Sequence, residues 1–166
     1  EIDKLLTDGY AEIVPDSESE GDDASERSRR VWYLPHHHVL NPNKPDKLRV
    51  VFDCASRFKG RSLNERCFQG PNLINPLLGV LLRFREHDLA IQADIKAMYN
   101  QVRIPEHDRD ALRFLWVRDG RLIHLRMIAH LFGGIWCSAV SSYALRKTVE
   151  SDSHIHPLVR HHVIQS

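Results

Sequence analysis

Asp94 is the first residue whose type and position point to chemistry. It follows an apolar run, and the sequence predicts a buried strand from Leu89 to Asp94. A carboxylate at the exposed end of a strand is held rigidly, and its hard oxygens suit Mg²⁺. Tyr99 comes five residues later, just past the predicted turn, and so near anything bound at the metal. The other interpretation is that Asp94 only caps the turn after its strand.

Two cations lie two residues apart in a second predicted strand. The stretch 47–53 alternates, so one face carries Lys47, Arg49, Val51 and Asp53 while the other carries Leu48, Val50 and Phe52. Side chains at i and i+2 on one face stand about 6.5–7 Å apart. Such a pair of cations suits a polyphosphate. The alternative is a solvated face on which Arg49 pairs with Asp53.

A glycine-containing turn, residues 130–134, separates a predicted strand from a predicted helix. Its sequence is His-Leu-Phe-Gly-Gly. Glycine lets the backbone approach a ligand closely, and the helix N-terminus that follows favours phosphate. The glycine spacing differs from that of a P-loop, so the pattern alone is a weak signal, and the alternative is an ordinary turn.

Histidines and cysteines are weaker candidates. The run His36–His38 and the histidines near the end of the chain have no cysteine partner at zinc-finger spacing, so we expect them on polar surface and in turns. Cys54, Cys67 and Cys137 form no Cys-x-x-Cys pair and are odd in number. We therefore expect reduced thiols that act as small buried apolar groups.

Length and composition fit one domain. With 166 residues, of which 42% are hydrophobic, the chain can bury one core but is too short for two full-sized domains. No apolar run approaches the roughly 20 residues that span a bilayer, and the first residues do not resemble a signal peptide. We expect a soluble, intracellular, cytoplasmic protein with no membrane partner.

The net charge of +1 hides an asymmetry. Residues 1–30 contain ten acidic and four basic residues, whereas residues 31–166 contain 12 acidic and 19 basic ones. The acidic, serine-rich stretch 15–30 has no large apolar residue, so we expect a flexible loop. The basic remainder is compatible with nucleic-acid binding, and equally with an ordinary mildly basic domain.

The remaining pattern mixes helices with antiparallel strands and has no regular βαβ rhythm, which predicts an α+β fold. Asp-Gly between two apolar runs predicts a hairpin of strands 112–117 and 122–127. We expect this hairpin and the strand ending at Asp94 to form a small antiparallel sheet backed by two of the helices. The other predicted elements are helices at 1–10, 76–85 (well buried), 134–150 and after Pro157, a strand at 31–34, a turn at 41–46, a loop at 55–72 and a turn at 105–110.

Taken in order, these pieces resemble the reverse transcriptase of Pao/BEL LTR retrotransposons. The resemblance lies in "WYLPHHHVLNPNKPDKLRVVFDCASRFKGRSLNE", "QGPNLINPLLGVLLRFREHDLAIQADIKAMYNQVRIPEHDRDALRFLW" and "HLFG". It extends from about Trp32 to Glu150, and residues 1–14 resemble the lead-in of the same family. The match is long and collinear, so it is more specific than any single motif.

The resemblance implies a partial right-hand polymerase, with fingers and the first part of a palm in residues 31–166. It implies two Mg²⁺ ions in the intact domain, with Asp94 as catalytic residue and metal ligand and the Ile95 carbonyl as a further ligand. Lys47 and Arg49 would hold the triphosphate, and Tyr99 would be the aromatic gate that excludes a ribose 2′-hydroxyl. Phe132 and Gly133 would line the nucleotide and template pocket. The implied partners are an RNA or DNA template–primer, dNTPs and the rest of a retroelement polyprotein.

Two departures from the family pattern matter. Where the family usually has Ser-Pro after "FG", this chain reads Ile135-Trp136-Cys137-Ser138-Ala139, and bulky Trp136 would crowd a row of small residues. The Tyr-x-Asp-Asp motif is absent, and Asp94 alone cannot hold two metals. We therefore predict that this chain by itself does not polymerise DNA.

Three other functions compete with this one. A non-catalytic nucleic-acid-binding remnant is the main alternative. An aspartic protease needs Asp-Thr-Gly or Asp-Ser-Gly, and neither occurs. An interaction module that uses the acidic stretch 16–30 would leave the order of the polymerase-like residues as coincidence.

Overall fold

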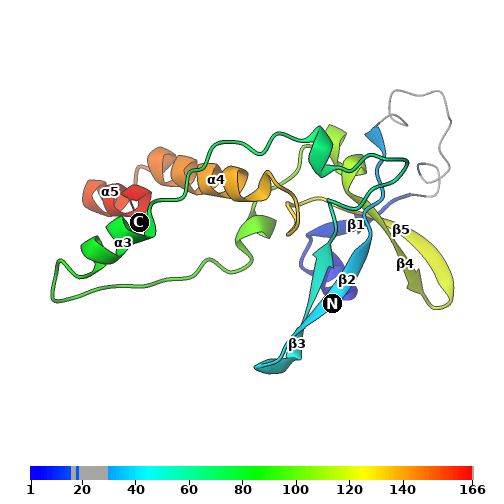
Figure 1. Ribbon diagram of the computed structural model, residues 1–166, viewed down its shortest axis with the longest axis horizontal. Helices are drawn as coiled ribbons and strands as arrows, with labels where there is room; N and C mark the ends of the chain where they lie inside the picture. Colours follow the sequence, from blue (N-terminus) through cyan, green and yellow to red (C-terminus); the bar gives the residue numbers. More distant parts are fainter. Residues whose placement is uncertain (16–17, 19–29, 166) are drawn as a thin grey trace.

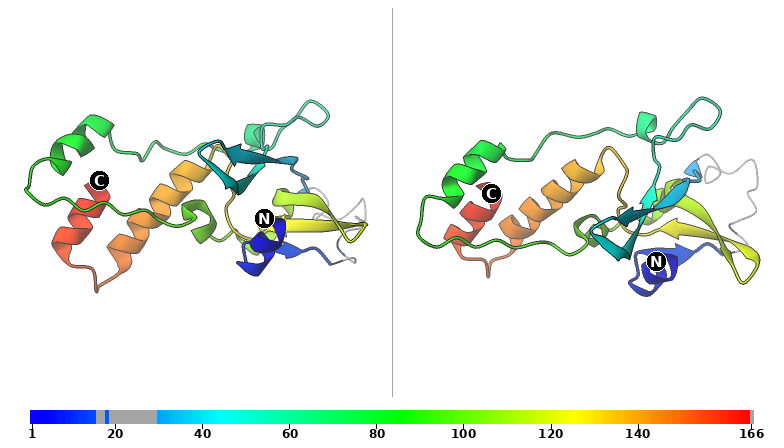
Figure 2. Two further views of the ribbon diagram at one scale, coloured as in Figure 1. Left: turned by 90° about the horizontal axis from the view of Figure 1, so that it is seen from below. Right: turned by 60° about the horizontal axis from the view of Figure 1, so that its bottom comes forward.

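The computed structural model describes residues 1–15, 18 and 30–165 (Figure 1). Apart from residues 15, 18 and 30, the predicted flexible loop at 15–30 lies outside the described residues. The fold is α+β, as predicted, with two small antiparallel sheets and several helices. Figures 1 and 2 show both sheets toward one end of an elongated molecule and helices α3, α4 and α5 together at the other.

The larger sheet has the strand order β1-β5-β4, with β1 at Ala11–Ile13, β4 at Arg113–Arg118 and β5 at Arg121–Met127. Strands β4 and β5 form the predicted hairpin. Asp119 and Gly120 both have positive φ, at 51° and 72°, as a two-residue hairpin turn requires. Strand β1 pairs with β5 through Ala11 opposite Met127 and follows helix α1, Ile2–Thr7.

The predicted strand from Leu89 to Asp94 is wrong. Residues 89–94 form no strand, and the side chains of Leu89 and Ile91 are 89% and 92% exposed. A strand is stable only where a neighbour takes its backbone hydrogen bonds, and the described chain places none beside this run. Strand β1 is the third member of the sheet instead.

The second sheet is a hairpin of β2, His36–Asn41, and β3, Lys44–Phe52. His36 lies opposite Phe52 and Val39 opposite Arg49, with an irregularity at Leu40/Asn41. The predicted strand at 47–53 therefore begins three residues earlier, and the predicted turn at 41–46 is reduced to residues 42–43. The predicted strand at 31–34 is only a single bridge from Tyr33 to Arg113, because regular pairing begins after Pro35.

The hydrophobic core lies where the β2–β3 hairpin packs on the larger sheet. The rings of Phe52 and Phe114 meet edge to face, with centroids 5.0 Å apart. Ile2 on α1 belongs to the same core. Its other buried members are Ala11, Leu34, Cys54, Leu63, Ile104, Leu112, Leu125, Met127 and Leu131.

Ion pairs join β5 to the N-terminal segment, where they are half-buried, and to the 3-10 helix η4, Glu106–Leu112, where the pair is buried. This helix replaces the predicted turn at 105–110. The Arg126 guanidinium lies 2.6 Å from the Glu12 carboxylate, 2.8 Å from that of Glu18 and 2.9 Å from that of Asp110. Asp110 also accepts a 2.9 Å hydrogen bond from the buried Arg113. Because isolated buried charges are costly, these contacts define how η4 and β1 lie against the sheet.

Helices α3, Leu77–Phe84, α4, Cys137–Ser151, and α5, Pro157–Gln165, confirm three helices that the sequence predicts. The prediction that the first is well buried is wrong, because Leu77 and Leu78 are each 71% exposed. Helix α4 contacts α5, and Arg146 donates a hydrogen bond to the Leu73 carbonyl ahead of α3. These helices lie beside one another rather than behind the sheet (Figure 2), so the prediction of a helix-backed sheet is also wrong. None of the helices among the described residues is long and apolar enough to cross a bilayer.

The stretch predicted as a loop, 55–72, is mostly irregular. It contains the short 3-10 helix η2, Asn64–Arg66, and an isolated bridge between Phe58 and Arg61. A further 3-10 helix, η3, spans Met98–Gln101.

Candidate functional site

Two of the predicted nucleotide-binding residues, Tyr99 and Phe132, are in contact. Their ring centroids lie 5.5 Å apart at an interplanar angle of 51°. Tyr99 belongs to η3, which the chain enters through Ala97 in a left-handed conformation. Asn100 donates a hydrogen bond to the His130 carbonyl and so ties η3 to the turn that carries Phe132. Phe132 is 61% exposed, so the aromatic pair presents one ring to solvent.

Gly133 packs against the last residue of β3. Its φ is +131°, and a Cβ built there would lie 2.1 Å from the Phe52 carbonyl oxygen. The close backbone approach that the glycine permits is therefore to Phe52, within the protein. The Cys137 thiol donates a hydrogen bond to the Leu131 carbonyl and holds the same turn from the other side. The turn at 130–134 is thus fixed to the end of the strand that carries the predicted triphosphate ligands.

Arg49 lies on the face of β3 that points away from the core. Its cross-strand partner is Val39, whereas Val50 and Phe52 lie on the core face. Arg49 is exposed and makes no ion pair within the described residues. The Asp53 carboxylate instead accepts hydrogen bonds from the backbone N–H groups of Ala55 and Ser56, so the alternative Arg49–Asp53 pair does not form. The side chain of Lys47 lies outside the described part of the structure.

Asp94 occupies the exposed irregular segment between α3 and η3. Its carboxylate makes no hydrogen bond or ion pair within residues 1–15, 18 and 30–165. The side chain of Ile95 is 43% exposed. No ring contact, hydrogen bond or ion pair among the described residues connects Asp94 to Tyr99, Phe132 or Arg49. The structure therefore joins Tyr99, Phe132 and Gly133 to the end of β3, and none of these contacts includes Asp94.

Asp94 and Ile95 are the two residues from which we expect Mg²⁺ ligands. The Asp94 carboxylate and the Ile95 carbonyl are hard oxygen ligands, which Mg²⁺ prefers. Among the described residues, no group of three or more His, Cys, Asp or Glu side chains is placed to hold a metal. Within the described residues, Asp94 therefore belongs to no such group of three or more potential metal ligands.

The cysteines agree with the sequence prediction. All three are free thiols, with Cys54 and Cys137 buried and Cys67 half-buried. Burial raises the pKa of Cys54 to about 12 and that of Cys137 to about 11. The two buried thiols therefore stay protonated. Cys54 packs in the hydrophobic core as an apolar group, whereas Cys137 also donates its hydrogen bond to Leu131.

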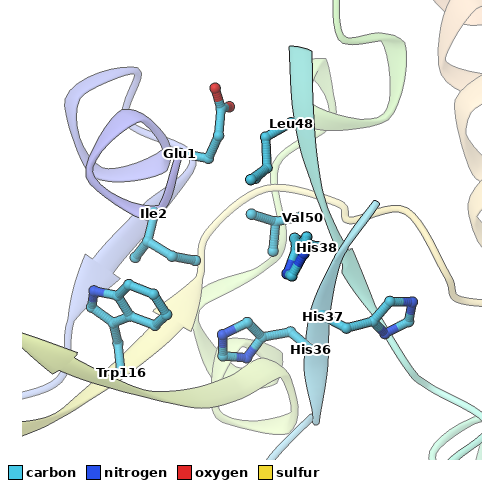
Figure 3. Close-up of a pocket in the computed structure, with 8 residues that line it drawn as sticks. All are labelled: Glu1, Ile2, His36, His37, His38, Leu48, Val50 and Trp116. Atoms are coloured by element: carbon cyan, nitrogen blue, oxygen red, sulfur yellow. The ribbon is translucent and has the colours of Figure 1, made fainter. Parts of the chain in front are cut away.

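A pocket that the sequence analysis missed lies on the core side of β2, next to α1 and β4 (Figure 3). Its volume is about 300 Å³. It is lined by Glu1, Ile2, His36, His37, His38, Leu48, Val50 and Trp116. His36 is half-buried against three aromatic rings rather than on the polar surface that we expected. The period-2 alternation of β4, which places Trp116 on the same face as Phe114, was the available signal.

Comparison with models of known protein families gives no match, and comparison with curated proteins gives none either. The resemblance to a retroelement polymerase therefore rests on the sequence segments quoted above.

Proposed function

We propose that the chain supplies the fingers and the first part of the palm of an RNA-directed DNA polymerase of the Pao/BEL retrotransposon type. In this proposal Arg49 and Lys47 hold the triphosphate of an incoming nucleotide. Tyr99, Phe132 and Gly133 surround its sugar and base, and Asp94 with the Ile95 carbonyl ligates Mg²⁺. The observation that carries the proposal is the contact of Tyr99 with Phe132 beside a turn packed on β3.

The geometry supports a nucleotide site in two ways. Gly133 joins the turn to β3, and Arg49 is exposed three residues before the strand ends. An exposed guanidinium without an ion-pair partner in the described chain is available for phosphate, which it binds through paired hydrogen bonds. Beside the turn, the exposed ring of Phe132 offers a flat apolar surface suited to a base.

Bound Mg²⁺ would neutralise charge on the triphosphate during transfer. The chain itself would contribute positioning, which is most of what a protein adds to phosphoryl-group transfer. A single carboxylate does not build a two-metal site, so we expect no primer extension by this chain on an RNA template with Mg²⁺. Clear synthesis would refute the carboxylate argument.

Nucleotide binding is the direct test. We expect a titration of the ¹⁵N-labelled chain with dATP and Mg²⁺ to shift the backbone amides of Arg49, Tyr99 and Gly133. Arg49→Ala should weaken binding about tenfold, as the loss of one charge-assisted hydrogen bond predicts. Arg121→Ala is the matched control, because it removes one exposed charge from the tip of the other hairpin and should change binding less than twofold.

Tyr99→Val tests the sugar gate separately. We expect it to bring ATP binding close to dATP binding, because the bulk that excludes the 2′-hydroxyl is removed. Equal effects of Arg49→Ala and Arg121→Ala would refute a triphosphate site on β3. Binding of oligonucleotides without any response to dATP would favour the alternative, a non-catalytic nucleic-acid-binding remnant.

A further inference from the structure

The pocket of Figure 3 is formed by strand alternation. Residues 36 and 38 of β2 point to the same side as Val50 and Leu48 of β3, because His38 lies opposite Val50 in the register. His37 belongs to the lining, but its ring points to the other side of β2 (Figure 3). Trp116 closes the pocket from β4, and Ile2 of α1 covers it from the side.

The walls suit a flat ring. Trp116 is 38% exposed although it carries the largest apolar side chain in the lining. Its ring centroid lies 5.9 Å from that of His36 at an angle of 50°, so the two rings form adjacent walls. Ile2, Leu48 and Val50 add aliphatic surface. A planar aromatic guest could stack on the indole and cover this surface.

The polar groups of the pocket are imidazoles. The nitrogens of His36 and His38 make no hydrogen bond within the described residues, and a neutral imidazole offers one donor and one acceptor. Burial, and then the neighbouring His37, lower the pKa of His36, so its ring stays neutral at pH 7. The lining contains no Lys or Arg, and the carboxylate of Glu1 points away from the pocket (Figure 3). These features disfavour a phosphate or carboxylate and favour a neutral heteroaromatic ring with hydrogen-bonding edges.

We propose that this pocket binds an unpaired nucleobase of a single-stranded nucleic acid, which stacks on Trp116 and hydrogen-bonds to His36 and His38. The inference rests on the proposed function, since it assumes that the chain meets a nucleic acid. Arg118 lies two residues beyond Trp116 on the same face of β4. Its half-exposed guanidinium lies 3.6 Å from the exposed Asp3 carboxylate, so a phosphate outside the pocket along this edge would replace Asp3 as its partner. A phenylalanine or leucine side chain of a protein partner would leave both imidazoles unused.

An abasic oligonucleotide allows the contribution of the base to binding to be measured separately from that of the sugar–phosphate backbone. We expect the chain to bind a 12-mer of deoxythymidylate about tenfold more tightly than an abasic 12-mer of the same charge, as stacking of a base on an aromatic ring predicts. Fluorescence anisotropy measures both affinities. Trp116→Ala should abolish the difference, while Trp116→Phe should keep most of it because the ring remains.

Two matched controls come from neighbouring residues. Leu115 lies on the opposite face of β4 and is 40% exposed, so Leu115→Ala should keep the preference. His38→Ala should reduce the preference for the deoxythymidylate 12-mer several-fold, whereas His37→Ala should leave this preference unchanged. Thermal melts of all variants would show whether each one is folded.

The outcomes distinguish the pocket from the function on which it rests. Equal, salt-dependent binding of both oligonucleotides, unchanged by Trp116→Ala, would overturn the pocket and leave nucleic-acid binding intact. No binding of either oligonucleotide would overturn both. Shifts of the His36 and His38 ring resonances with N-acetylphenylalanine amide, but not with the oligonucleotide, would assign the pocket to a protein side chain and overturn the proposal.

Discussion

Asp110 is the carboxylate that two buried guanidinium groups share, and replacing it with asparagine should destabilise the fold strongly. Its Oδ1 accepts hydrogen bonds of 2.9 Å from Arg113 and of 2.9 Å from Arg126. Arg126 also pairs with Glu12 and Glu18, whereas Arg113 has no second carboxylate among the described ion pairs. The change would therefore leave the charge of Arg113 buried without a carboxylate partner, with only the Glu18 carbonyl and the Tyr33 hydroxyl as remaining hydrogen-bond acceptors.

The magnitude follows from that uncompensated charge. Removing one partner of a buried ion pair costs about 3–5 kcal/mol. For a chain of this length, 1 kcal/mol lowers the melting temperature by about 2–4 °C. We therefore expect Asp110→Asn to melt about 6–20 °C below the original protein, as followed by circular dichroism. Asp108→Asn is the matched control, because this acid is 57% exposed and should cost within about 0.5 kcal/mol.

The pH dependence tests the same contact independently. Burial raises the pKa of Asp110, but the hydrogen bonds from Arg126 and Arg113 outweigh it and hold the pKa below the ordinary value. A carboxylate with a depressed pKa stabilises the fold above about pH 4 and loses that contribution as the pH falls further. The difference between the original protein and Asp110→Asn should therefore shrink below about pH 4. Melting of Asp110→Asn within 2 °C of Asp108→Asn at pH 7 would refute the reasoning.

Two further predictions concern the turn at 130–134. Gly133→Ala should cost about 3 kcal/mol, because it combines a strained backbone with a collision at the Phe52 carbonyl. Gly60 has a φ of +78°, closer to the left-handed region that L residues can adopt, and nothing lies within 4 Å of a Cβ built there, so Gly60→Ala should cost only about 1 kcal/mol. Equal shifts in the urea midpoint of the two variants would contradict the argument. Burial lowers the pKa of His130, so the unfolded chain takes up a proton first and stability should fall as the pH drops below about 6.5. His130→Asn should reduce the change of melting temperature with pH. The change that remains should come from His36, whose pKa is also lowered. An unchanged pH dependence would exclude His130 as the cause.

Locally encoded elements were predictable from the sequence. The β4–β5 hairpin follows from Asp119 and Gly120, whose positive φ values define the turn. Helix α3 follows Pro76, which is pre-organised for a helix start. In both cases the signal lies within a few neighbouring residues, so tertiary packing was not needed to read it.

Elements that depend on distant partners were not predictable. The run at 89–94 has the composition of a strand, yet strand formation depends on a neighbour that the sequence does not identify. The prediction that α3 is buried failed for the same reason. An apolar helix face indicates that the helix needs a partner, but it does not show that a partner is present. The pairing of Arg126 with Glu12 and Asp110 results from the register of β1 on β5 and the position of η4. No local pattern marks these three residues as a group.

The candidate site also has one part that contacts within the chain hold in place and one part that they do not. Tyr99, Phe132 and Gly133 are held by contacts within the chain, because η3 packs on the glycine turn and the turn packs on the end of β3. Asp94 lies in a segment whose apolar side chains, such as Leu89 and Ile91, are almost fully exposed. Exposed apolar surface of this kind favours association, so whatever covers residues 85–97 would also determine where the Asp94 carboxylate points. The contacts among these three residues are therefore built into this chain, whereas the position of the Asp94 carboxylate depends on a surface that the described residues leave open.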